Sequence, residues 1–201
     1  RQLEKENVNG EIYGTGVLKK YLLFPQKSGD ITIDPFQVDC IVQKRVEGQS
    51  SRSIFDDFFG SYQKVKMPVA SDPVQIHVRS LPGQTPRDFS GGVGSFDIKA
   101  SVNKHAVKTN EGVTLTVEVS GSGNLKVLDP PQVSFPPDLE VYDPKISDNI
   151  QVSGNGASGK KTMEYLIIPR HAGNYKIPSI HMSYFDLGSQ SYQPARTQPL
   201  S

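Results

Sequence analysis

The sequence predicts an all-β protein made of tandem β-sandwich domains. Three observations predict this fold class: apolar and polar side chains alternate over short segments, turn-forming residues separate these segments, and one sequence pattern occurs twice. Glycine and proline contribute 18 and 15 of the 201 residues, a larger share than the roughly one residue in eight of an average protein. This composition indicates many turns between short elements, and no segment shows the 3.6-residue periodicity of an amphipathic helix.

The second half of the chain carries the clearest strand pattern. In residues 96–102 and 113–119 every second residue is apolar. Because successive side chains of a strand point to opposite faces, each segment has one face for a core and one for water. We predict further strands at 125–128, 139–142, 150–153, 162–168, 175–177, 180–185 and 190–197. Many short strands within roughly 100 residues predict one complete immunoglobulin-like β-sandwich over residues 93–201.

A sequence repeat relates the two halves. The pattern of residues 21–33 returns at 165–177, with tyrosine, leucine, proline, glycine and isoleucine in the same register. An internal repeat indicates two copies of one domain type. We interpret each copy as a strand that ends at a proline, a tight turn and a second strand. Gly29 and Gly173 would then have the positive φ angles that glycine tolerates best.

The repeat also predicts the domain boundaries. We assign residues 1–81 to the C-terminal part of a first immunoglobulin-like β-sandwich, 82–92 to a linker rich in proline and glycine, and 93–201 to the second sandwich. The tyrosine of the repeat lies near the start of the chain in the first copy but about 70 residues into the second domain. We therefore expect the first domain to be N-terminally incomplete. Residues 47–66 have no counterpart in the second copy and are interpreted as an inserted loop.

Charge and hydropathy argue against nucleic-acid binding and against a transmembrane segment. The 22 basic and 21 acidic side chains give a net charge of +1, which does not favour nucleic-acid binding. The longest apolar runs, residues 21–24 and 165–168, each end at a proline. Both runs are far shorter than the roughly 18 residues of a transmembrane helix, so we predict no transmembrane segment here.

No residue pattern predicts catalysis or metal binding. The chain has no Gly-x-Ser-x-Gly motif, which marks the nucleophile of one large class of hydrolases. Its single cysteine, Cys40, alternates in phase with Val38 and Val42, so we place it on a core face. His77 and His181 alternate out of phase with their apolar neighbours and should point to solvent. We therefore predict no catalytic residue, no cofactor and no metal site, and a protein that is not an enzyme.

An aromatic cluster inside the inserted loop is the candidate binding site. Phe55, Phe58 and Phe59 lie within five residues, together with Asp56 and Asp57. Aromatic residues in a long loop are candidates for docking a protein partner. The alternative interpretation is a structural one, in which the loop folds back and covers an open end of its own sandwich.

Several motifs, in a fixed order, resemble those of a known family. They are Gly-Ser-Phe-Asp-Ile at residues 94–98, Ser-Gly-Ser-Gly-Asn-Leu at 120–125, Lys-Thr-Met-Glu-Tyr-Leu-Ile-Ile-Pro at 161–169 and Ala-Gly-Asn-Tyr-Lys-Ile-Pro at 172–178. With residues 21–29 of the first half, this series resembles the BatD family of exported bacterial proteins, which are linked to oxygen tolerance, or aerotolerance. The resemblance spans nearly the whole chain.

The resemblance implies a setting and partners. Such proteins have tandem immunoglobulin-like domains on the periplasmic side of the inner membrane and a membrane anchor, which is expected outside these residues. Their genes neighbour those of a MoxR-type ATPase and of membrane proteins with von Willebrand A domains. We therefore expect a non-enzymatic scaffold for envelope proteins, with a role in oxygen tolerance or envelope stress. The alternative is a cell-surface adhesin or glycan-binding module, although the chain lacks the tryptophans that suit an aromatic sugar platform.

Overall fold

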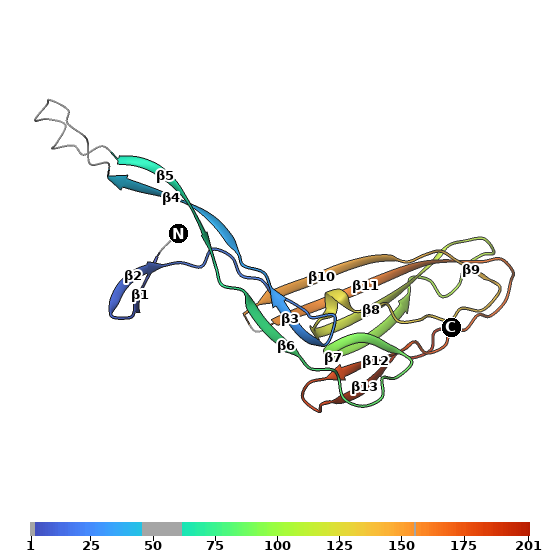
Figure 1. Cartoon of the computed structure of the whole chain (residues 1–201). Helices are drawn as coiled ribbons and strands as arrows, with labels where there is room; N and C mark the ends of the chain where they lie inside the picture. The colour runs from blue at the N-terminus through green and yellow to red at the C-terminus, as the bar shows by residue number, and fades with distance from the viewer. Residues whose placement is uncertain (1–2, 46–61, 155) are drawn as a thin grey trace, which may run out of the picture. The chain divides into compact units, whose positions relative to one another are not determined.

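The computed structural model describes residues 3–45, 62–154 and 156–201. In this part of the chain every element is a β-strand except one short 3-10 helix, η1 (Leu125–Val127), so the all-β prediction is confirmed. The chain divides into two compact units, one of residues 1–24 and 81–201 and the other of residues 25–80. The strands, labelled in Figure 1, are β1 (Glu4–Val8), β2 (Glu11–Thr15), β3 (Gly29–Ile33), β4 (Gln37–Arg45), β5 (Tyr62–Ala70), β6 (Val74–Val78), β7 (Phe89–Val102), β8 (Val113–Gly123), β9 (Leu139–Val141), β10 (Lys145–Ser153), β11 (Gly156–Pro169), β12 (His181–Asp186) and β13 (Ser191–Arg196).

Residues 81–201 are built on a seven-stranded sheet. Its hydrogen-bonded order is β10-β11-β8-β7-β12-β13, and β9 pairs with the end of β11. Strand β7 belongs to two parts of this sheet, because residues 89–93 pair in parallel with β12 whereas residues 94–102 pair antiparallel with β8. As a result β12 and β13 form a second layer against β7, β8 and β11 (Figure 1).

The core of this unit lies between the two layers and follows the alternation predicted from the sequence. In β8, Leu115, Val117 and Val119 are fully buried, whereas the residues between them are only half-buried. Met163 of β11 and Met182 of β12 belong to the same buried cluster. Full burial of one such side chain stabilises the folded state by roughly 1.5–3 kcal/mol, so this cluster is the main source of stability of residues 81–201.

Strands β7 and β8 approach each other closely where β8 ends. Gly121 has a φ angle of 156° and lies opposite Phe96 of β7. A methyl group on its Cα would overlap the backbone oxygen of Ser95. Gly156, at the start of β11, has a positive φ angle of 129° but no heavy atom within 4 Å of the place that a methyl group would take. Glycine is therefore required at position 121 by the close approach as well as by the backbone angle.

One charged side chain occupies an inward-facing position of the sheet. Lys161 of β11 is 7% exposed. Its Nζ donates hydrogen bonds to the backbone oxygens of Lys126, at 3.1 Å, and of Leu128, at 2.7 Å. A buried ammonium group needs such acceptors because burial without them is costly. Lys161 thus fastens η1 and the residue after it to the sheet.

The observed elements differ from the predicted ones at several places. Residues 125–127 form η1 rather than a strand, and residues 175–177 contribute only one bridge, between Ile177 and Leu200. Strand β7 begins at Phe89, inside the segment interpreted as a linker. Strand β5 begins at Tyr62, inside the segment interpreted as an inserted loop.

The two copies of the sequence repeat adopt different local structures. Gly29 has a φ angle of 107°, as predicted, but Gly173 does not have a positive φ angle, so the prediction for Gly173 is wrong. The turn at Gly173 is closed differently, by a hydrogen bond of 2.8 Å from the Tyr175 hydroxyl to the backbone oxygen of His171. Residues 165–168 lie in β11, whereas residues 21–24 are not in a strand.

Replacing Gly121 by alanine should lower the free energy of unfolding by about 1–3 kcal/mol more than replacing Gly156 by alanine. Both sites have positive φ angles, so the difference isolates the contact with the backbone of β7. Urea unfolding of the intact chain, followed by circular dichroism, measures both losses. Equal losses would show that the close approach is not a constraint.

Replacing Lys161 by methionine should cost about 1–3 kcal/mol, because two backbone oxygens lose their donor. The control is Lys160→Met, one residue away on the outer face. Lys160 pairs with Glu118 at 3.0 Å and is largely exposed, so we expect a change within about 0.5 kcal/mol. If both variants unfold at the same denaturant concentration, Lys161 does not hold η1.

Candidate interaction surface

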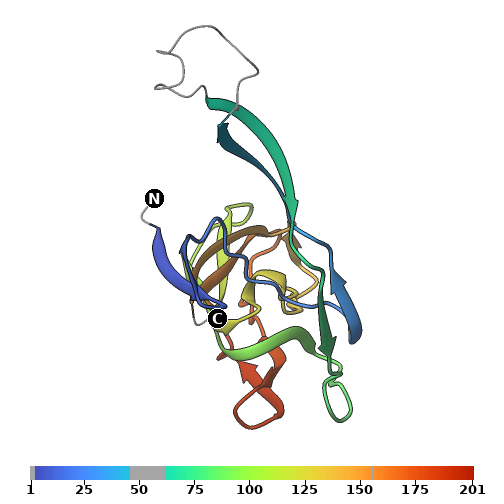
Figure 2. The same cartoon turned by 60° about the vertical axis from the view of Figure 1, so that its left-hand side comes forward.

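Residues 25–80 contain two separate antiparallel pairs of strands. Strand β3 pairs with β6 over five residues, and β4 pairs with β5 over nine. The β4–β5 pair is a long twisted ribbon (Figure 2). Because directly opposed residues of two paired strands point to the same side, the register assigns each side chain to a face.

One face of the β4–β5 ribbon carries three successive apolar pairs and ends in a polar pair, Lys44–Gln63. The opposed pairs Val38–Val69, Cys40–Met67 and Val42–Val65 alternate with pairs that point to the other side. We call the face formed by these residues the apolar ribbon face: Val38, Cys40, Val42, Val65, Met67 and Val69.

The apolar ribbon face is only partly buried. Met67 and Val69 are 51% and 50% exposed, and Val42 and Val65 also remain exposed. Cys40 lies on this face in the predicted phase but is only half-buried, so its predicted place in a core is wrong. The physical reason is that, among the described residues of 25–80, no second layer buries this face as β12 and β13 bury that of β8.

The opposite face of the β3–β6 pair is polar, and that of the β4–β5 ribbon is mostly polar, although it also carries Ile41, which is 71% exposed. On the β4–β5 ribbon, Lys66 and Asp39 form an ion pair of 2.8 Å whose side chains are both largely exposed. On the β3–β6 pair, His77 Nδ1 lies 2.6 Å from a carboxylate oxygen of Asp30, which confirms that His77 points to solvent. Exposed ion pairs of this kind contribute at most about 1 kcal/mol each. They lie on the more polar face of each strand pair, so the other face is the one suited to apolar contacts.

This arrangement has the chemistry of a binding surface. A sheet of two strands is marginally stable in water and usually gains stability when another layer covers its apolar face. Contiguous exposed apolar side chains, bordered by polar ones, mark sites that bind other proteins. The apolar ribbon face is therefore suited to contact an apolar strand or sheet surface of a partner.

Two other kinds of site are absent from the described ranges. No group of three or more His, Cys, Asp or Glu side chains there could hold a metal ion. No helix in those ranges is long and apolar enough to cross a membrane.

The predicted docking residues Phe55, Asp56, Asp57, Phe58 and Phe59 lie in residues 46–61, outside the described residues. The prediction that this cluster docks a partner therefore remains a prediction. Sequence reasoning missed strand β5 and with it half of the apolar ribbon face. The signal was present, because Val65, Met67 and Val69 alternate with Lys66 and Pro68.

Comparison with known protein families gave a match over the second half of the chain. Residues 100–201, slightly more than half of the chain, match the profile described as the BatD DUF11 like domain. No curated protein and no solved structure matches the chain. The matched residues include β8, β11, β12 and η1, and so most of the buried core of residues 81–201.

Two methionines in comparable strands test whether the apolar ribbon face is uncovered in the free protein. Met163 in β11 is fully buried, whereas Met67 is half exposed. Met163→Ala should cost about 2–5 kcal/mol of unfolding free energy, and Met67→Ala should change it by no more than about 0.5 kcal/mol. Denaturant unfolding of the intact chain measures both. A cost for Met67→Ala close to that for Met163→Ala would mean that this face is already buried.

Proposed function

Because the chain belongs to the BatD family, we propose that it is a non-enzymatic protein-interaction module on the periplasmic side of the bacterial inner membrane. In this proposal its two halves are tandem immunoglobulin-like domains that scaffold envelope proteins. The physiological role is oxygen tolerance or protection against envelope stress, as the family resemblance implies. The layered all-β organisation of residues 81–201 supports the domain assignment, since two layers packed around one core are typical of such sandwiches.

The observation that carries this proposal is the apolar ribbon face. Interfaces between proteins obtain most of their affinity from a few apolar residues at the centre of the contact, surrounded by polar residues. Val42 and Met67 present such a surface, and the Asp39–Lys66 pair lies on the opposite side of the ribbon.

The proposed partners are membrane-associated envelope proteins with von Willebrand A domains. The family resemblance implies these partners, and their binding can be measured with purified protein. The contact itself would be an extended apolar surface on that partner, because the apolar ribbon face offers six neighbouring apolar side chains along two strands.

We predict that Val42→Lys weakens binding of the von Willebrand A protein by at least about tenfold, since one lysine would have to be buried unpaired in the contact. The control is Gln43→Lys, the next residue of β4, which introduces the same charge on the opposite face. Titration calorimetry with a purified von Willebrand A domain protein from the same organism measures both variants.

Three outcomes are distinguishable. Tenfold weakening by Val42→Lys alone supports the apolar ribbon face as the contact. Equal effects of both variants would place the contact elsewhere. No binding of the von Willebrand A protein to the wild-type chain would reject this partner, and binding of oligosaccharides instead would favour a glycan-binding module.

A further inference from the structure

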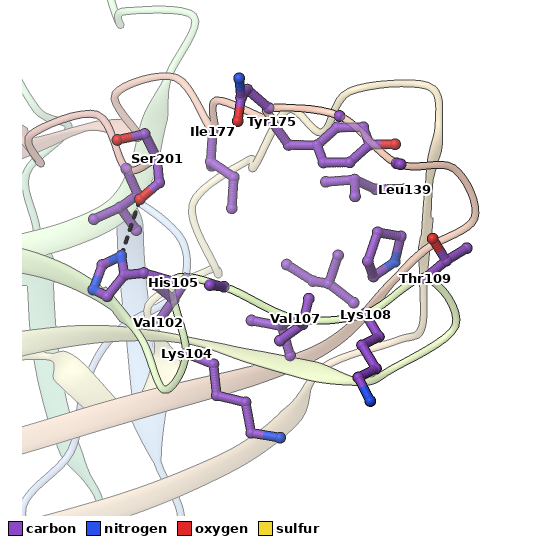
Figure 3. Close-up of a pocket in the computed structure, with 18 of the residues that line it drawn as sticks. Val102, Lys104, His105, Val107, Lys108, Thr109, Leu139, Tyr175, Ile177 and Ser201 are labelled. Atoms are coloured by element: carbon purple, nitrogen blue, oxygen red, sulfur yellow. Dashed lines mark hydrogen bonds between the residues drawn. The ribbon is translucent and has the colours of Figure 1, made fainter.

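A cavity of about 820 Å³ opens in the unit that contains residues 81–201. It lies among the loop after β7, the turn after β11 and residues 200–201, as Figure 3 shows. Its volume is within the range of roughly 300–1,000 Å³ that is usual for small-molecule sites. The cavity shares no residue with the apolar ribbon face, so a ligand bound in it would be independent of the proposed function.

The loop that forms the first wall is held by specific hydrogen bonds. The side chain of Asn103 accepts a bond of 2.8 Å from the backbone N–H of Thr114. The backbone N–H of Asn110 donates to the oxygen of Pro169 at 2.9 Å, and Arg170 donates to the side chain of Asn110 at 2.8 Å. These bonds tie residues 103–112 to both β8 and the end of β11.

The turn after β11 forms the second wall and is held by an exposed polar cluster. Glu140 accepts a hydrogen bond of 2.6 Å from the Tyr142 hydroxyl and also pairs with Arg170. The hydrogen bond from Tyr142, followed by that from Arg170, holds the pKa of Glu140 below its ordinary value. These two hydrogen bonds favour the ionised carboxylate, which is the form that accepts from both partners.

The third wall is formed by the last residues of the sequence. Ile177 and Leu200 exchange two backbone hydrogen bonds of 2.9 and 3.0 Å. His105 Nδ1 lies 2.9 Å from the backbone oxygen of Ser201. All three walls are thus fixed by contacts within the protein, which makes the cavity a preformed feature rather than a gap between loose loops.

The lining of the cavity is more apolar than polar, and its aliphatic part is continuous with the core. Val102, Leu139 and Leu200 line the cavity and pack against the buried core, to which Ile177 belongs, and Val107 faces them from the loop. Tyr175 adds a phenol ring to the lining, and His105, His171 and Asn174 add polar groups. Such walls suit a flexible alkyl chain, which fills an irregular aliphatic space without bringing in polar groups. A peptide would bring backbone N–H and C=O groups that need partners.

The charged side chains of the lining are all basic. Lys104 and Lys108 line the cavity, and no aspartate or glutamate does so in the described part of the chain. Lys104 pairs with Glu111 at 2.5 Å, whereas the structure gives no ion pair for the Lys108 ammonium group among the described residues. Both lysines extend away from the cavity centre in Figure 3. The Glu111 carboxylate also accepts a hydrogen bond of 3.2 Å from the backbone N–H of Lys108 and offsets the charge of Lys104. The Lys108 ammonium group, unpaired among the described residues, therefore places positive charge beside the cavity.

We propose that this cavity binds a single-chain anionic amphiphile, with its alkyl chain against the aliphatic lining and its carboxylate or phosphate beside Lys108. A free fatty acid and a one-chain phospholipid share this chemistry. The aliphatic interior supplies the affinity through burial of apolar surface, and Lys108 selects the sign of the head group.

The test titrates the intact chain with dodecanoate, below the concentration at which it forms micelles, and with dodecyltrimethylammonium as a probe of equal chain length and opposite charge. We expect saturable binding of dodecanoate, at least about tenfold tighter than that of the cation. Lys108→Glu should abolish or reverse this preference. Lys126→Glu, a charge reversal of an exposed lysine outside the cavity, should leave it unchanged.

A second pair of variants tests the location of the alkyl chain. Val107→Trp fills the cavity and should remove binding of both probes, whereas Val127→Trp, on η1 outside the cavity, should not. If Val107→Trp fails to fold, the Lys108→Glu result decides alone. The proposal is overturned if wild-type protein shows no saturable binding of dodecanoate, or if the preference survives Lys108→Glu.

The source of the ligand is identified by a third arm with phosphatidylglycerol vesicles loaded with dodecanoate or with the corresponding one-chain phospholipid. Transfer of either ligand from vesicles to the protein supports the proposal and names the preferred head group. Binding to whole vesicles that is unaffected by Val107→Trp contradicts it, because the membrane surface would then be the ligand.

Discussion

The need to bury the apolar face that each alternating strand creates is the constraint on which the rest of the structure depends. In β8 the apolar face is covered by β12 and β13, and Val117 is completely removed from water. In the β4–β5 ribbon the same alternation leaves Met67 half exposed. The same two-residue period therefore produces a core in one unit and a surface in the other. Apolar surface left in water carries a free-energy cost of roughly 25 cal/mol per Å². A partner that covers the apolar ribbon face would therefore gain binding free energy from the surface removed from water.

The polar contacts of residues 81–201 serve this packing. Lys161 ties η1 to the sheet from an inward-facing position, and Gly121 allows β7 and β8 to approach at the end where the two layers join. The hydrogen bond from Arg170 to Asn110 joins the turn after β11 to the loop after β7, and both segments line the cavity at the edge of the core.

The sequence predicts the strands best where alternation is long and both faces have distinct environments. Residues 113–119 are such a case, and the buried phase of Leu115 and Val117 is a direct consequence of it. The three residues of η1 are too few to distinguish a strand from a helical turn, because their structure depends on the distant donor Lys161. Strand β5 was missed although Val65 and Met67 alternate, since Pro68 and the preceding glycine- and serine-rich segment favour a loop. The apolar ribbon face and the cavity each require residues far apart in the sequence to come together, and no local pattern specifies that pairing.

Hydrogen exchange of backbone amides, measured on the intact chain alone and with the von Willebrand A partner, tests the central claim most directly. Exchange reports local opening, which is rare where apolar faces are covered. The account predicts slow exchange in β8 and β11 under both conditions. It also predicts fast exchange in β4 and β5 in the free chain, which slows when the partner binds. Slow exchange in β4 and β5 without a partner, or fast exchange that the bound partner leaves unchanged, would contradict the assignment of the apolar ribbon face as the interaction surface.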